Sequence, residues 1–188
     1  LAGTFGGSYM ISDVFSVGLA GRYTSAKRTY DAEGSFIIVD GASGMPVDTT
    51  HHELDATKTG SGFNGIISVN ARLSDRVNAA IRYETVTTME METETDVNDW
   101  AALTAAPFNS FADGFEQRRD LPAVLAGGVT YQANDKLNLA LSGNYYFLEQ
   151  ADQGQQDAYD DDYKNGYEIG TGMDYQITPK VMGGLSYL

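Results

Sequence analysis

The sequence has no cysteine, and no uninterrupted apolar run in it approaches the roughly 20 residues that a membrane-spanning helix needs. Without cysteine, neither a disulfide framework nor a thiolate metal site can form. Basic residues are few, since 12 lysines and arginines stand against 26 aspartates and glutamates and the net charge is −14. Nucleic acids are bound by clustered Lys and Arg that displace counterions, so no nucleic-acid partner is expected.

Patterns that support catalysis are also missing. The chain has two histidines, no cysteine, no Gly-x-Ser-x-Gly motif and no glycine-rich phosphate loop before a helix. We therefore expect no catalytic residue, no cofactor and no enzyme, and keep a barrel-embedded lipase or protease only as a third hypothesis. His51 and His52 are adjacent, and neighbours in an extended segment point to opposite sides, so they are poor joint ligands and no metal site is expected.

One pattern occurs four times: an alternating apolar strand, a short polar turn and a second alternating strand. The turns lie at residues 12–13, 74–76, 134–136 and 178–180. After the third turn, Leu139, Leu141 and Tyr145 share one face, while small or polar residues occupy the other. Strands of about ten residues with aromatic ends are typical of tilted strands that cross a bilayer.

This pattern predicts an all-β fold, an antiparallel transmembrane β-barrel, as one domain over residues 1–188 with about eight readable strands. The turn spacing leaves long segments near 25–60, 88–119 and 150–164. We expect these to be extracellular loops or strands that protrude beyond the bilayer.

The acidic residues gather in these long segments. Four carboxylates alternate with apolar or hydroxyl residues and so share one face of an extended strand: Glu90, Glu92, Glu94 and Asp96. They form either a rim that attracts cations or, as we favour, the wet face of a protruding strand. Asp157 and the aspartates at 160–162 are interpreted as a repelling loop tip, with a loose divalent-cation site as the alternative.

Large apolar residues interrupt the acidic composition of the segment 88–119. Residues 96–99 can cap a short helix over 100–106, which Pro107 ends. The apolar groups either pack as the loop's own core or form a groove for a hydrophobic ligand. The candidate ligand-binding residues are Trp100, Leu103, Phe108, Phe111 and Phe115.

Residues 120–147 resemble the outer-membrane long-chain fatty-acid transporter family (FadL-type). They contain a Leu-Pro pair, a Gly before a Tyr-Gln strand end, an Asn-Asp-Lys turn and an apolar strand that runs to aromatics. The pattern recurs at 163–180 and, more weakly, at 63–76. The resemblance implies a barrel of about 14 strands with an N-terminal plug. Because no Asn-Pro-Ala plug start is found, we expect the chain to be an incomplete piece of such a barrel, with a self-contained eight-stranded barrel as the alternative.

The resemblance also implies a function: a porin-like channel in the bacterial outer membrane for passive uptake of hydrophobic compounds such as long-chain fatty acids. The expected partners are membrane lipid, lipopolysaccharide and hydrophobic small molecules, and an outer-membrane protein partner is left open. The alternative is a small structural or adhesive barrel whose loops bind partners.

Overall fold

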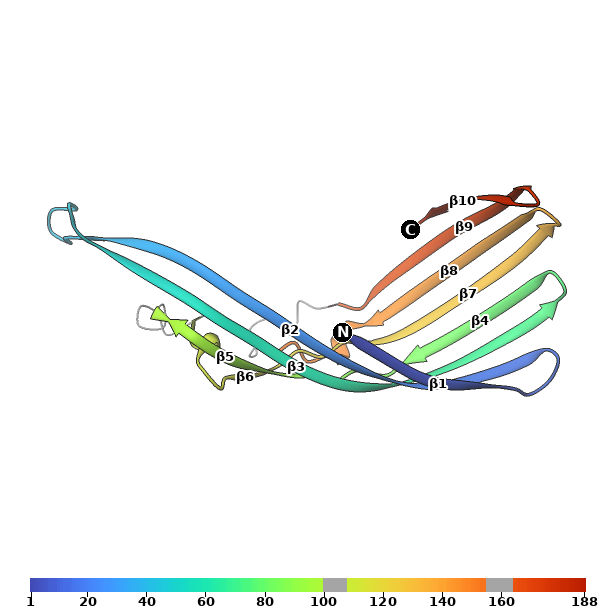
Figure 1. Ribbon diagram of the computed structural model, residues 1–188, viewed down its shortest axis with the longest axis horizontal. Helices are drawn as coiled ribbons and strands as arrows, with labels where there is room; N and C mark the ends of the chain where they lie inside the picture. Colours follow the sequence, from blue (N-terminus) through green and yellow to red (C-terminus); the bar gives the residue numbers. More distant parts are fainter. Residues whose placement is uncertain (100–107, 155–163) are drawn as a thin grey trace. The chain divides into compact units, whose positions relative to one another are not determined.

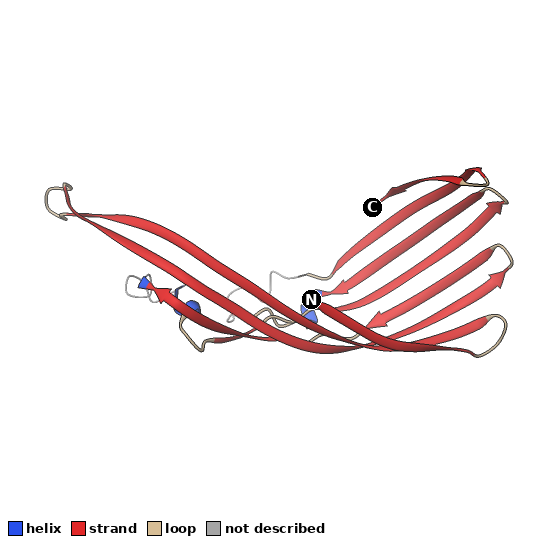
Figure 2. Cartoon of the chain, in the orientation of Figure 1, coloured by secondary structure: helices blue, strands red, loops and turns tan. Residues whose placement is uncertain are grey.

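The computed structural model describes residues 1–99, 108–154 and 164–188. These residues form strands almost throughout, joined into one antiparallel sheet (Figures 1 and 2). The strands are β1 (Ala2–Met10), β2 (Phe15–Val39), β3 (Pro46–Ser74), β4 (Val77–Glu84), β5 (Glu90–Asn98), β6 (Glu116–Arg118), β7 (Ala123–Asn134), β8 (Leu137–Phe147), β9 (Gly166–Thr178) and β10 (Val181–Tyr187), with short 3-10 turns η2 (Phe108–Phe111) and η3 (Leu148–Gln150). Across these three ranges, no helix is long and apolar enough to cross a membrane.

The chain divides into two compact units. The first, here the wall unit, contains Ala2–Thr24, Gly62–Thr88 and Arg119–Leu188. The second, here the hairpin unit, contains Ser25–Ser61 and Met89–Arg118 together with Leu1. Strands β2 and β3 each contribute one part to each unit.

The wall unit is a curled antiparallel sheet of eight strands in the order β1-β2-β3-β4-β7-β8-β9-β10. Figure 1 shows β4, β7, β8 and β9 side by side. The predicted all-β, antiparallel fold is confirmed. Among the described residues β1 and β10 have one neighbour each, so the eight strands are not closed on themselves.

All four short turns lie where the sequence places them, and each is held by a local side-chain oxygen. Ser12 Oγ accepts from the N–H of Phe15 at 3.1 Å, and Ser74 Oγ accepts from the N–H of Val77 at the same distance. Asn134 Oδ1 accepts from two backbone N–H groups, and Thr178 Oγ1 accepts from one. Ser, Thr and Asn favour turns because they bond to their own backbone in this way.

The strand register sorts the wall unit into an apolar and a polar face, because directly opposed residues project to the same side. One apolar row contains Val77, Tyr131, Leu139, Met173 and Leu185. One polar row contains Arg82, Ala126, Asn144 and Glu168. Large apolar side chains such as Leu141 and Ile169 are more than half exposed in this chain, which suits a face that meets lipid.

The hairpin unit contains β2 from Ser25 onward and β3 up to Ser61. Strand β5 pairs with this part of β3, and β6 pairs with β5. The segment 25–60, expected as a loop or a protruding strand, is therefore mostly a β-hairpin. Buried and exposed residues alternate clearly in β5, where Met91 and Thr93 are buried and the four carboxylates from Glu90 to Asp96 are exposed. The expectation that these carboxylates share one face is confirmed. The helix expected over 100–106 lies outside the described residues.

Candidate functional site

The predicted ligand-binding residues fall in the hairpin unit. Trp100 and Leu103 lie outside the described residues, and Phe108 is the first residue of η2. Phe111 ends η2, and Phe115 comes directly before β6; both are partly buried. The structure brings these last two rings to the same place.

Both rings lie around the side chain of Lys58. The Nζ atom of Lys58 on β3 lies 4.6 Å from the ring centre of Phe111 and 5.8 Å from that of Phe115. Tyr30 on β2 is the third ring, with its centre 5.9 Å from Nζ and 4.8 Å from the centre of Phe111 in an edge-to-face arrangement. Lys58 is only 7% exposed. We call these four residues the Lys58 cluster.

Hydrogen bonds from β5 hold the segment that carries the two phenylalanines. The hydroxyl of Thr95 donates to the carbonyl of Phe111 at 2.6 Å, and the side-chain amide of Asn98 donates to the same oxygen. The N–H of Thr93 donates to the carbonyl of Phe115 at 2.9 Å. The two rings thus pack against Lys58 and Tyr30, and the groove for a hydrophobic ligand stays a prediction. The two interpretations of the sequence describe the same residues and do not exclude each other.

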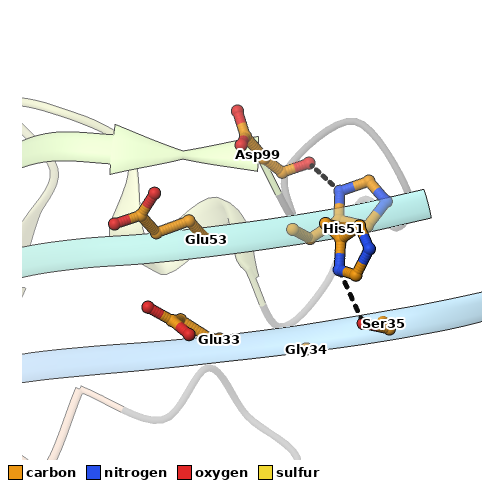
Figure 3. Close-up of a pocket in the computed structure, with 7 residues that line it drawn as sticks. Glu33, Gly34, Ser35, His51, Glu53 and Asp99 are labelled. Atoms are coloured by element: carbon orange, nitrogen blue, oxygen red, sulfur yellow. Dashed lines mark hydrogen bonds between the residues drawn. The ribbon is translucent and has the colours of Figure 1, made fainter.

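A second feature of the hairpin unit is an open pocket of about 380 Å³ between its two long strands (Figure 3). His51 Nδ1 pairs with the hydroxyl of Ser35 at 2.8 Å, whereas His52 Nδ1 pairs with the carbonyl of Asp99 at 3.2 Å. The adjacent histidines therefore point to different partners, as the extended backbone predicts. Over the three described ranges, no group of three or more His, Asp or Glu side chains is arranged to hold a metal ion.

The polar face of the wall unit carries an ion cluster that the sequence analysis missed. The guanidinium of Arg22 lies 2.5 Å from the carboxylate of Glu84, and Arg82 lies 3.1 Å from its other oxygen. The Glu84 side chain is 8% exposed. Asn64 is buried nearby on β3 and donates to the carbonyl of Thr85, while its side-chain oxygen has no partner among the described residues. The pairing joins strands far apart in the chain, so no local pattern marks it.

Other polar side chains on this face are also hydrogen bonded. The amides of Asn70 and Asn78 bond to each other in both directions, at 3.1 and 2.8 Å. Tyr146 donates its hydroxyl to Glu168 at 2.6 Å. Tyr146 thus belongs to the polar face of β8, whereas its neighbour Tyr145 shares the apolar face with Tyr83.

Three solved structures are similar to the chain in fold. A Pseudomonas aeruginosa FadL homologue matches with a TM-score of 0.58 and 16% identity, over 98% of this chain and 48% of that one. The Ralstonia pickettii toluene transporter TbuX matches with a TM-score of 0.59 and 14% identity, over 98% and 54%. The CymD monoaromatic hydrocarbon channel matches with a TM-score of 0.55 and 11% identity, over 97% and 57%.

Neither the family models nor the curated protein sequences contain a match to the chain. The chain spans about half the length of the three solved structures that it matches. Nearly all of its own length is aligned, and identities this low carry the fold alone. The resemblance found in the sequence is therefore confirmed at the level of fold: over the half that it spans, the chain has the fold of the FadL-type β-barrels.

Proposed function

We propose that this chain is part of a channel in the bacterial outer membrane for passive uptake of hydrophobic compounds. The observation that carries the proposal is the eight-stranded sheet with one apolar and one polar face in a FadL-type fold. Such a sheet suits a wall between lipid and a hydrated interior. Two of the similar structures are named as a toluene transporter and a monoaromatic hydrocarbon channel, which supports a hydrophobic ligand.

Within this class, long-chain fatty acids are the proposed ligands. Binding would come from burial of the alkyl chain, at roughly 0.8 kcal/mol per CH₂, with no covalent chemistry and no catalytic residue. The proposed partners are therefore membrane lipid, lipopolysaccharide and the ligand itself. A small aromatic hydrocarbon is the competing ligand class, favoured by the names of the two similar structures.

The proposed ligand site is the apolar surface formed by Trp100, Leu103, Phe108, Phe111 and Phe115. Support comes from the last two, whose rings are gathered at one place and only partly buried in an otherwise acidic unit. An apolar surface in a charged surrounding is a common sign of ligand binding.

Replacement of both described rings tests this site. We expect Phe111→Asp with Phe115→Asp to weaken binding of cis-parinaric acid by at least about tenfold, since each buried ring contributes on the order of 1 kcal/mol or more. Fluorescence titration of the full-length protein in detergent measures the affinity, and the heat-modifiable mobility of the barrel on a gel checks folding.

The matched control adds two carboxylates elsewhere in the same unit. Phe36→Asp with Ile38→Asp changes two exposed residues of β2 outside the Lys58 cluster and leaves the affinity unchanged. Equal affinity of the first variant and the unmodified protein would refute the site. If the unmodified protein binds neither parinaric acid nor toluene, uptake of hydrophobic compounds is refuted and an adhesive or structural barrel is favoured.

A further inference from the structure

The Lys58 cluster places a buried ammonium group among three aromatic rings. An ammonium group loses favourable hydration on burial, which is costly unless its surroundings compensate. A methionine would fill a similar volume at this position without that cost. The faces of aromatic rings supply part of such compensation, because they attract a cation.

The rings that surround the ammonium come from three separate parts of the chain. Tyr30 belongs to β2, Phe111 to η2, and Phe115 to the segment before β6. All three ring centres lie within 6 Å of Nζ. Attraction between a cation and a ring is strongest over the ring face, because the face carries the negative end of the quadrupole. A cation therefore fixes the orientation of a ring, whereas an aliphatic neighbour accepts many orientations.

We propose that Lys58 is the positioning residue of the hydrophobic site in the hairpin unit. Its ammonium holds Phe111 and Phe115 toward β3, so that the exposed parts of the rings form a fixed apolar surface. This inference rests on the proposed function, because the ligand is the hydrophobic compound of that proposal. Lys58 acts on the rings and does not contact the ligand, so its loss weakens charged and neutral ligands alike.

Three variants of the full-length protein test this role in ligand binding. Lys58→Met removes the charge and keeps the volume, Lys58→Arg keeps a cation, and Lys27→Met removes an exposed charge from β2 as the control. The probes are cis-parinaric acid and its uncharged methyl ester, titrated by fluorescence. We expect Lys58→Met to weaken both probes by about tenfold, Lys58→Arg to stay within about threefold, and Lys27→Met to have no effect.

Two results of these titrations overturn the inference. Equal affinities of Lys58→Met and the unmodified protein for both probes would show that the charge does not order the site. Loss of affinity for the acid alone would show that Lys58 meets the carboxylate head group directly. If the unmodified protein binds neither probe, long-chain fatty acids are not its ligands, and the role of Lys58 is decided by a measurement without ligand.

That measurement uses fluorinated phenylalanine at position 111. Successive fluorine atoms weaken the negative ring face while the ring shape changes little. We expect proteolysis between residues 108 and 118 to become faster in the order of one, two and three fluorine atoms when Lys58 is present. The same series in the Lys58→Met background gives a flat response. A flat response in both backgrounds refutes the positioning role. This test does not depend on whether the larger arginine side chain of Lys58→Arg can be accommodated at position 58.

Discussion

Nη1 of Arg22 lies 2.5 Å from Oε2 of Glu84, and β3 lies between the two strands that carry this pair. The Arg22 side chain therefore crosses β3 on the polar face. Its Nε also donates to the hydroxyl of Thr4 on β1 at 3.1 Å. One side chain thus links β1, β2 and β4. The link lies at the end of the β3–β4 pairing, where Glu84 is opposite Ile66.

Loss of Glu84 should destabilise the wall more than loss of either arginine partner alone. Glu84→Gln leaves two guanidinium groups close together without a counter-charge, and we expect a loss of about 1–3 kcal/mol in the free energy of unfolding. Arg82→Gln should cost less than about 1 kcal/mol, because the Arg82 side chain is 49% exposed. Urea unfolding in lipid vesicles measures both. Equal losses would show that the cluster does not depend on the buried carboxylate.

The two faces of β8 should respond differently to one and the same substitution. Leu141 belongs to the apolar row with Val129 and Thr171, whereas its neighbour Ala140 lies on the polar face opposite Thr130. If the apolar face meets lipid, as the proposed function requires, Leu141→Arg places a charge there, and we expect about 2–4 kcal/mol of destabilisation near the bilayer centre. Ala140→Arg should cost less than about 1 kcal/mol. Refolding into vesicles compares the two, and the reverse order would contradict the assignment of the faces.

Adjacent glycines on β1 offer a second matched pair. A Cβ atom added at Gly6 would meet the side chain of Ala20 and lie 2.7 Å from the carbonyl of Leu19, whereas one added at Gly7 meets no atom of the described residues within 4 Å. Gly6→Ala should therefore destabilise by about 1–3 kcal/mol through overpacking. Gly7→Ala should be neutral or stabilising by up to about 1 kcal/mol. Similar unfolding midpoints for the two variants would show that β1 and β2 pack less closely at Gly6.

The turns and the faces of the sheet could be predicted from the sequence because both depend on local rules. A strand alternates with period two, and Ser74 or Asn134 closes a turn by bonding to residues two and three positions ahead. Such signals need no knowledge of the partner strand.

The ion cluster and the Lys58 cluster could not be predicted in the same way. Arg22 and Glu84 are 62 residues apart, and their contact depends on the register of three strands. Lys58 looks in the sequence like an ordinary exposed lysine of a polar segment. It becomes buried because the segment that carries Phe111 folds back over β3, and only the aromatic content of that segment hinted that it would pack on something.

The tip of the β2–β3 hairpin should depend on pH through Asp40. Its carboxylate accepts from the hydroxyl of Ser43 at 2.6 Å and from the backbone N–H groups of Ser43 and Ala42. These bonds, with that of the Ser43 hydroxyl first, lower the pKa of Asp40 below the ordinary value of 3.8. The turn also needs Gly44, whose φ is +67° and whose N–H donates to the carbonyl of Asp40.

The sign of this effect follows from the lowered pKa. The carboxylate form is favoured in the folded turn, so its contribution is fully present above pH 3.8 and is lost as the pH falls through the lower folded value. We expect NMR titration to give an Asp40 pKa below 3.8, and the Ser43 amide to lose protection from hydrogen exchange over the same range. In Asp40→Asn the exchange of this amide, corrected for its intrinsic pH dependence, should be flat. An Asp40 pKa at or above 3.8 would contradict the hydrogen bonds to Ser43, because a carboxylate that accepts them is harder to protonate.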